Sequence, residues 1–152
     1  MIYLDSSALM KLVREEDETG SLREWLRAQP GQPVVTSELG RVEVLRAARR
    51  IGGQVPSDAR GVVGALDLVP LDRAVQDLAC DIADPVLRSL DALHLASAVL
   101  LSEELTAFVA YDHRLVDAAR TAGLVVATPG RPGTHAIGRS SFRTGPGARS
   151  PA

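Results

Sequence analysis

Short runs of apolar and β-branched residues alternate along the chain with longer segments in which apolar residues recur every three or four positions. Such a run, bounded by Gly, Pro or an acidic residue, predicts a buried β-strand. Five runs of this kind occur, at residues 1–5, 33–37, 68–71, 106–112 and 124–129. These are the expected strands.

The segments between the runs have the periodicity of helices with one apolar face. The segments expected to be helical are residues 6–16, 18–30, 37–53, 57–68, 72–84, 87–101 and 113–123. Ser6 or Ser7 is expected to cap the first helix, and Thr36 or Ser37 the third, because short hydroxyl side chains accept hydrogen bonds from free N–H groups. Strands that alternate with helices imply parallel pairing through helical crossovers. The expected fold class is therefore α/β, a sandwich with helices on both faces of the sheet.

Composition limits the chain to one soluble domain. Its 152 residues are 45% apolar and 24% charged, which is ordinary for a globular protein. Cys80 is the only cysteine, which excludes an intrachain disulfide and suits a reducing cytosol. No apolar run approaches the roughly 20 residues of a membrane helix, and no signal peptide is recognisable. We expect a cytoplasmic protein with no membrane partner.

The net charge of −2 conceals an uneven distribution. Residues 129–152 contain four arginines and no acid, whereas residues 1–128 contain 13 basic and 19 acidic side chains, a charge of −6. The chain is therefore expected to consist of a domain at residues 1–128 and a tail at residues 129–152 that is rich in Pro, Gly and Arg and disordered. The tail is either a solvated extension or a weak, salt-sensitive contact for nucleic-acid phosphates.

Two aspartates follow apolar strands and precede helices. Asp5 ends the run "MIYLD", and Asp112 ends the run "FVAYD". In an open parallel sheet, ligands bind at the edge formed by the carboxyl ends of the strands. The alternative is that each aspartate merely caps the helix that follows it.

Two further acids border the expected core. Asp91 lies near the start of the most apolar helix, where the helix dipole or an ion pair with Arg88 could compensate its charge. Glu43 lies four residues after Leu39 and four before Ala47, so it borders the inward face of its helix. Its alternative is a surface ion pair with an arginine of the same helix.

Carboxylates that converge repel one another, and a hard divalent cation removes that conflict. Mg²⁺ and Mn²⁺ prefer oxygen ligands and keep several waters. No cluster of Cys or His has the spacing of a zinc site. A phosphotransferase of the haloacid dehalogenase type would need a second Asp where this chain has Ser7, and a receiver domain would need a lysine at a strand end that this chain lacks. Composition and spacing thus allow an acidic site compatible with a divalent metal, beside the helix caps and ion pairs named for each acid.

Four stretches carry a resemblance to a known family: "MIYLDSSALMKL", "VVTSELGRVEVLRA", "LDALHLASA" and "FVAYDHRL". In this order, across residues 1–128, the chain resembles the PIN-domain ribonucleases, in particular the VapC toxins of type II toxin–antitoxin systems. The resemblance implies a PIN-like three-layer sandwich in which helices flank a central parallel sheet of four to five strands.

The resemblance also implies the site residues. The acidic metal-binding and catalytic residues would be Asp5, Glu43, Asp91 and Asp112. Ser7 would match the small hydroxyl residue that orders the site, whereas Ala110 replaces the family's Thr or Ser two residues before the last Asp. His94 is expected to be structural, packed and hydrogen-bonded.

The implied activity is Mg²⁺-dependent endonucleolytic hydrolysis of RNA (tRNA, rRNA or mRNA), with Mn²⁺ as a substitute metal. Phosphate contacts are expected from Arg46, Arg49, Arg50 and Arg114, although arginines on an exposed helix are often only solvated. The implied partners are a VapB-type antitoxin and a second copy of the chain in a homodimer. Side chains that could contact a partner, or simply pack in the core, are Leu9, Leu12, Trp25 and Leu26. The alternative function is a catalytically silent PIN fold that binds RNA or protein.

Overall fold

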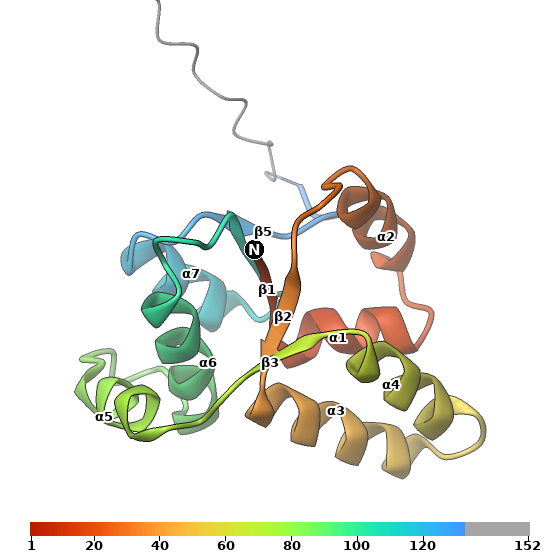
Figure 1. Cartoon of the computed structure of the whole chain (residues 1–152), viewed down its shortest axis with the longest axis horizontal. Helices are drawn as coiled ribbons and strands as arrows, with labels where there is room; N and C mark the ends of the chain where they lie inside the picture. Colours follow the sequence, from red (N-terminus) through yellow and green to blue (C-terminus); the bar gives the residue numbers. More distant parts are fainter. Residues whose placement is uncertain (133–152) are drawn as a thin grey trace, which may run out of the picture.

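The computed structural model describes residues 1–132 and contains a single sheet of five parallel strands (Figure 1). The order across the sheet is β3-β2-β1-β4-β5, so the first strand lies at the centre. The strands are β1 (Ile2–Leu4), β2 (Val34–Ser37), β3 (Asp67–Val69), β4 (Ala107–Val109) and β5 (Val126–Ala127). All five expected strands are therefore present.

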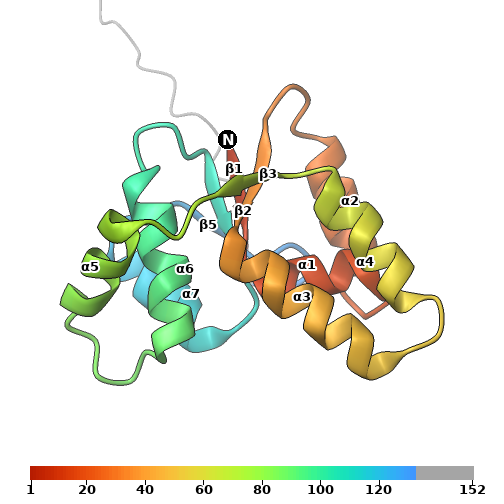
Figure 2. The same cartoon turned by 60° about the horizontal axis from the view of Figure 1, so that its bottom comes forward.

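Helices cover both faces of the sheet, which confirms the three-layer α/β sandwich. One face carries α1 (Ser6–Val13), α2 (Thr19–Arg27), α3 (Glu38–Ile51) and α4 (Val55–Gly64), and the other carries α5 (Arg73–Asp81), α6 (Ser89–Leu100) and α7 (His113–Thr121). The two groups lie on opposite sides of the strands in Figures 1 and 2.

Strand β1 is buried on both faces, as expected for the centre of a parallel sheet. Ile2 and Leu4 pack in the apolar cluster under α1–α4, whereas Tyr3 packs in the cluster under α6 and α7. The Tyr3 ring stacks on Phe108 with a centroid distance of 5.4 Å. The alternation places Tyr3 on the same side of the sheet as α6.

Three local predictions were wrong. The first helix is capped by Asp5, whose side chain accepts the Ala8 N–H, and not by Ser6 or Ser7. The helix expected at residues 57–68 begins at Val55, since Pro56 suits the first turn, and ends at Gly64. The strand expected at residues 68–71 begins at Asp67, because an edge strand tolerates an exposed acid that the sequence pattern assigns to a helix.

The chain after β5 packs back against the domain. A turn allowed by the positive φ of Gly130 brings the Arg131 N–H to the Thr128 carbonyl. The Tyr111 hydroxyl donates to the Pro129 carbonyl at 2.9 Å, and Arg131 pairs with Glu18 at 3.2 Å. Contacts of the domain thus extend past residue 128. The rest of the expected tail, residues 133–152, lies outside the described residues, so its disorder stays a prediction.

Within residues 1–132, no helix is long and apolar enough to cross a membrane. The side chains that could contact a partner are instead largely part of the core. Leu9 is fully buried, and Leu12, Trp25 and Leu26 are partly buried and pack against the cluster under α1–α4.

Candidate active site

Asp5 lies where β1 ends and α1 begins, and only 4% of its surface is exposed. Its Oδ1 accepts the Ala8 N–H at 2.8 Å. The Ser7 hydroxyl lies 2.7 Å from Oδ1 and 2.9 Å from Oδ2. Contacts within the first turn of α1 therefore fix the Asp5 carboxylate. Asp5 caps α1, which the sequence offered as the alternative to a ligand site, and its side chain is also buried.

Ser7 connects Asp5 to the end of β4. The Tyr111 N–H donates to Ser7 Oγ at 2.8 Å, and the Asp5 N–H donates to the Val109 carbonyl at 3.0 Å. This hydroxyl thus bridges two strand ends. Ser7 lies where the resemblance placed a residue that orders the site.

Burial makes Asp5 an unusual acid. It raises the pKa of Asp5 to about 6 from an ordinary value of 3.8, against an opposing influence of His94. The negative charge of Glu43 raises the pKa of Asp5 further. Among the ion pairs of residues 1–132, none joins Asp5 to a lysine or arginine. The site therefore holds a buried carboxylate with no fixed cation beside it.

Asp112 and Asp91 form the opposite part of the site. Asp112 caps α7, where its Oδ1 accepts the N–H groups of Arg114 at 3.0 Å and Leu115 at 3.2 Å. Asp91 lies in the first turn of α6. Burial, and after it the charge of Asp112, raises the pKa of Asp91. Arg88 attracts Asp91 but forms no ion pair with it in the described part of the chain.

Glu43 is half-buried on α3 and is held by His94 and Ser6 rather than by arginines. Its Oε2 accepts hydrogen bonds from His94 Nε2 at 2.9 Å and from the Ser6 hydroxyl. Burial opposes ionisation, but the hydrogen bonds from His94 and Ser6 outweigh it and hold the pKa of Glu43 below its usual range. The surface ion pair that the sequence left open is absent from residues 1–132.

His94 is buried and hydrogen-bonded, as expected. The Tyr3 hydroxyl lies 2.8 Å from its Nδ1. Sequence reasoning missed Tyr3 and Ser6 as neighbours of the site. The strand alternation that turns Tyr3 toward α6 was a usable signal, but the pairing of Tyr3 with His94 depends on tertiary packing.

The remaining candidates lie at the periphery. Arg46, Arg49, Arg50 and Arg114 are exposed, and none has an ion pair within residues 1–132. Ala110 is fully buried in the apolar cluster with Phe108 and Leu115. The guanidinium groups of the four arginines are therefore available to solvent or to a ligand.

The oxygen-rich side chains fit a hard divalent cation by their chemistry. No three His, Cys, Asp or Glu side chains of the described residues are close enough to hold an ion together. Besides burial, the charge of Glu43 raises the pKa of Asp5, and the charges of Asp112 and Glu43 raise the pKa of Asp91, so the carboxylates lie as two neighbouring pairs, Asp5 with Glu43 and Asp91 with Asp112. Mg²⁺ commonly binds to one or two carboxylates and completes its shell with waters and phosphate oxygens. Such a shell suits these pairs better than an all-protein cage would.

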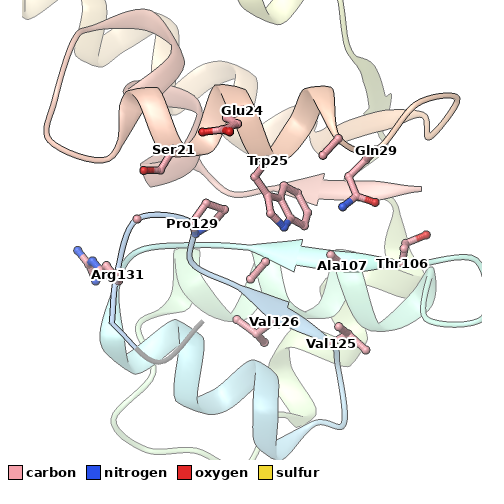
Figure 3. A pocket seen from close by; sticks show the side chains of 13 residues that line it. Ser21, Glu24, Trp25, Gln29, Thr106, Ala107, Val125, Val126, Pro129 and Arg131 are labelled. Atoms are coloured by element: carbon pink, nitrogen blue, oxygen red, sulfur yellow. The ribbon is translucent and has the colours of Figure 1, made fainter. Parts of the chain in front are cut away.

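A cavity of about 450 Å³ lies elsewhere, between α2 and the strands β4 and β5. Figure 3 shows Trp25 above this cavity, Val126 below it and Arg131 at its rim. None of the four candidate acids lines it. The acidic site is therefore separate from this cavity.

Comparison with known proteins places the chain in a family. Residues 2–121 match the PIN domain. Ribonuclease VapC47 of Mycobacterium tuberculosis (strain CDC 1551 / Oshkosh) is 52% identical over 134 residues, covering 86% of this chain and 98% of that protein. Ribonuclease VapC46 of Mycobacterium tuberculosis (strain ATCC 25618 / H37Rv) is 43% identical over 128 residues, covering 84% of this chain and 97% of that protein.

Solved structures share the fold at lower identity. A chain of a toxin–antitoxin complex from Klebsiella pneumoniae aligns with a TM-score of 0.65 and 18% identity, covering 85% of this chain and 98% of that chain. VapC20 of Mycobacterium tuberculosis, described as a sarcin-ricin loop cleaving toxin, aligns with a TM-score of 0.63 and 20% identity, covering 82% of this chain and 97% of that chain. The chain therefore belongs to the PIN domain family, within its VapC ribonuclease group.

Proposed function

We propose that this protein is a metal-dependent endoribonuclease that hydrolyses RNA phosphodiester bonds and serves as the toxin of a type II toxin–antitoxin pair. One observation carries the proposal: four carboxylates gather at the carboxyl edge of the sheet, and none has a lysine or arginine partner within residues 1–132. The acids are Asp5, Glu43, Asp91 and Asp112. The names of the relatives support the reaction class.

The proposed cofactor is Mg²⁺, with Mn²⁺ as a substitute, held by the two pairs of acids, with waters and phosphate oxygens completing its shell. A bound divalent cation lowers the pKa of a coordinated water and neutralises charge on the phosphate. The chain's own contribution is to orient the ligands. Ser7 holds both oxygens of Asp5, and His94 with Ser6 holds one oxygen of Glu43. Without a cation, the negative charge of the acidic site repels RNA. Bound divalent cations reverse this charge, so that the site attracts RNA.

RNA recognition is proposed to depend on phosphates and shape. The exposed arginines Arg46, Arg49, Arg50 and Arg114 are the candidates for phosphate contacts. Aromatic residues make up only 3% of the chain, which disfavours binding by extended base stacking. Single-stranded or looped RNA is the substrate class that this chemistry fits.

A VapB-type antitoxin is the proposed inhibitor. Solved chains of this fold include one from a toxin–antitoxin complex of Klebsiella pneumoniae and one from VapBC2 of Rickettsia felis, which supports a partner of this kind. We also propose that the protein is cytoplasmic and forms a homodimer. Co-expression with the neighbouring small open reading frame, followed by size-exclusion chromatography of the complex, tests both partners.

Cleavage of a heterogeneous RNA pool in Mg²⁺ or Mn²⁺ tests the activity. We expect Asp5→Asn and Asp91→Asn to abolish cleavage while the proteins remain folded. The matched control is Asp117→Asn on α7, an exposed acid paired with Arg120, which should cleave as the wild type does. If the wild type cuts no RNA with either metal, hydrolysis is refuted and the silent binding module remains. If the site variants cut equally well, the four acids are not the site of cleavage and the proposed mechanism is refuted.

A further inference from the structure

The His94 ring lies where four elements meet. It belongs to α6, and it contacts Tyr3 of β1, Ser6 of α1 and Glu43 of α3. Only 2% of the residue is exposed. Since every neighbour within hydrogen-bond distance comes from a different element, the ring joins both faces of the sheet at the edge where the acids gather.

The hydrogen-bond partners define the role of each ring nitrogen. Nε2 of His94 lies 2.9 Å from Oε2 of Glu43, and since a carboxylate oxygen accepts hydrogen bonds, Nε2 is the donor in this contact. On the other side of the ring, the Tyr3 hydroxyl lies 2.8 Å from Nδ1, where it can donate. A ring with its proton on Nε2 satisfies both contacts.

The ring also has little room to turn. The Tyr3 ring meets it edge-on, with centroids 5.9 Å apart and an interplanar angle of 83°. On another side, Gly40 of α3 lies so close that an added Cβ would be 3.2 Å from His94 Cε1 and 2.3 Å from Thr36 Oγ1. Any side chain at position 40 would therefore push α3 away from the ring. Packing and hydrogen bonds together fix the orientation of Nε2.

A fixed Nε2 determines what Glu43 presents to the site. Oε2 is occupied by His94 and Ser6, whereas Oε1 accepts no hydrogen bond from the described residues. A glutamate side chain that is 28% exposed would otherwise sample several rotamers. The contacts with His94 and Ser6 thus hold Oε2 of Glu43 toward the interior and leave Oε1 available to a ligand.

We propose that Tyr3 and His94 act as positioning residues for Glu43, holding its Oε2 so that Oε1 is presented to a divalent cation at the acidic site. The inference rests on the proposed function in one respect, namely that Glu43 is a cation ligand. Neither Tyr3 nor His94 need touch the cation or the RNA. Hydrogen-bond partners behind a ligand typically change metal affinity by about 10- to 100-fold when removed.

Two substitutions of similar size distinguish positioning from packing. In His94→Gln, the side-chain amide nitrogen reaches the place of Nε2 and can still donate to Glu43. In His94→Asn, the shorter amide reaches only the place of Nδ1, so the contact with Tyr3 survives and the one with Glu43 is lost. We expect Mn²⁺ binding without RNA, measured by electron paramagnetic resonance, to weaken at least about tenfold in His94→Asn and only several-fold in His94→Gln, which keeps the contact with Glu43 and loses the one with Tyr3.

Tyr3→Phe is the second variant, because it keeps the ring packing and removes only the hydroxyl. It should weaken Mn²⁺ binding several-fold. If the unfolding transition shows that His94→Asn does not fold, Mn²⁺ binding by Tyr3→Phe tests the positioning role in its place. Wild-type-like Mn²⁺ affinity in His94→Asn, or equal losses in the Asn and Gln variants, would overturn the positioning role alone. A wild-type protein that binds no Mn²⁺ would overturn both this role and the proposed metal site.

Discussion

The substitution Asp5→Asn should have opposite effects on stability and on activity. In the absence of metal, burial raises the pKa of Asp5 to about 6, so folding at neutral pH places an ionised carboxylate where charge is disfavoured. Asparagine is neutral and remains a good helix cap, since its amide oxygen can still accept the Ala8 N–H. The variant therefore removes the unfavourable charge and retains the capping contact.

The magnitude follows from the two pKa values. The folded state binds the Asp5 proton more tightly than the unfolded chain does, so the stability of the wild type falls as the pH rises from about 4 to 6. Above pH 7 the full cost is about 3 kcal/mol, and near pH 4.5 it is about 1 kcal/mol. The amide nitrogen cannot accept from Ser7 Oγ, which costs the variant about 1 kcal/mol. The net gain is about 2 kcal/mol at pH 8 and near zero at pH 4.5.

Urea denaturation in EDTA at pH 8 and at pH 4.5 measures both values. We expect the variant to unfold at higher urea only at pH 8, and added Mg²⁺ to stabilise the wild type alone. RNA cleavage measured on the same samples should be lost. A variant that is less stable at pH 8, or a stability difference that does not change with pH, would refute the argument from burial of the Asp5 charge.

Three other changes have expected outcomes. Ser7→Ala leaves the Tyr111 N–H without its acceptor and should lower the free energy of unfolding by about 1–3 kcal/mol in urea titrations; an unchanged midpoint would contradict the bridge. A chain ending at Thr128 should melt at lower temperature than one ending at Pro132, because the Tyr111 hydroxyl loses its hydrogen bond to the carbonyl of residue 129. Equal melting temperatures would place the domain boundary at residue 128. Arg114→Gln should weaken RNA binding and reduce its dependence on log salt by about 0.7, measured by fluorescence anisotropy; an unchanged slope would exclude a phosphate contact.

The sequence predicts most of the sheet and the approach of the acids. Asp5 and Asp112 follow strands whose apolar pattern is unambiguous, and parallel strands end at one edge, so their proximity follows from topology. The position of Asp91 in the first turn of α6 follows likewise from the apolar helix around it. What compensates Asp91 was open, and the structure excludes an ion pair with Arg88 within the described residues.

The contacts of Glu43 could not be predicted in the same way. Four arginines on its own helix were available as partners in the sequence, yet Glu43 bonds to His94, 51 positions away. Which partner Glu43 bonds to depends on how closely α3 approaches α6. Gly40 permits this close approach, and no local sequence pattern encodes it. The boundary between α4 and β3 was misplaced for a related reason, since β3 is an edge strand whose exposed residues lack a strand's usual pattern.

Strand β1 lies at the centre of the sheet although it is the first to be synthesised. The Asp5 N–H donates to the carbonyl of Val109. The segment that carries the first acid therefore cannot complete its strand pairing until a segment more than a hundred residues later has been synthesised. Pairing over such a separation is slow, because the loop must close before any contact is gained. The acids come together only after Asp112 has been added. A nascent chain on the ribosome therefore carries no assembled acidic site until Asp112 has been translated.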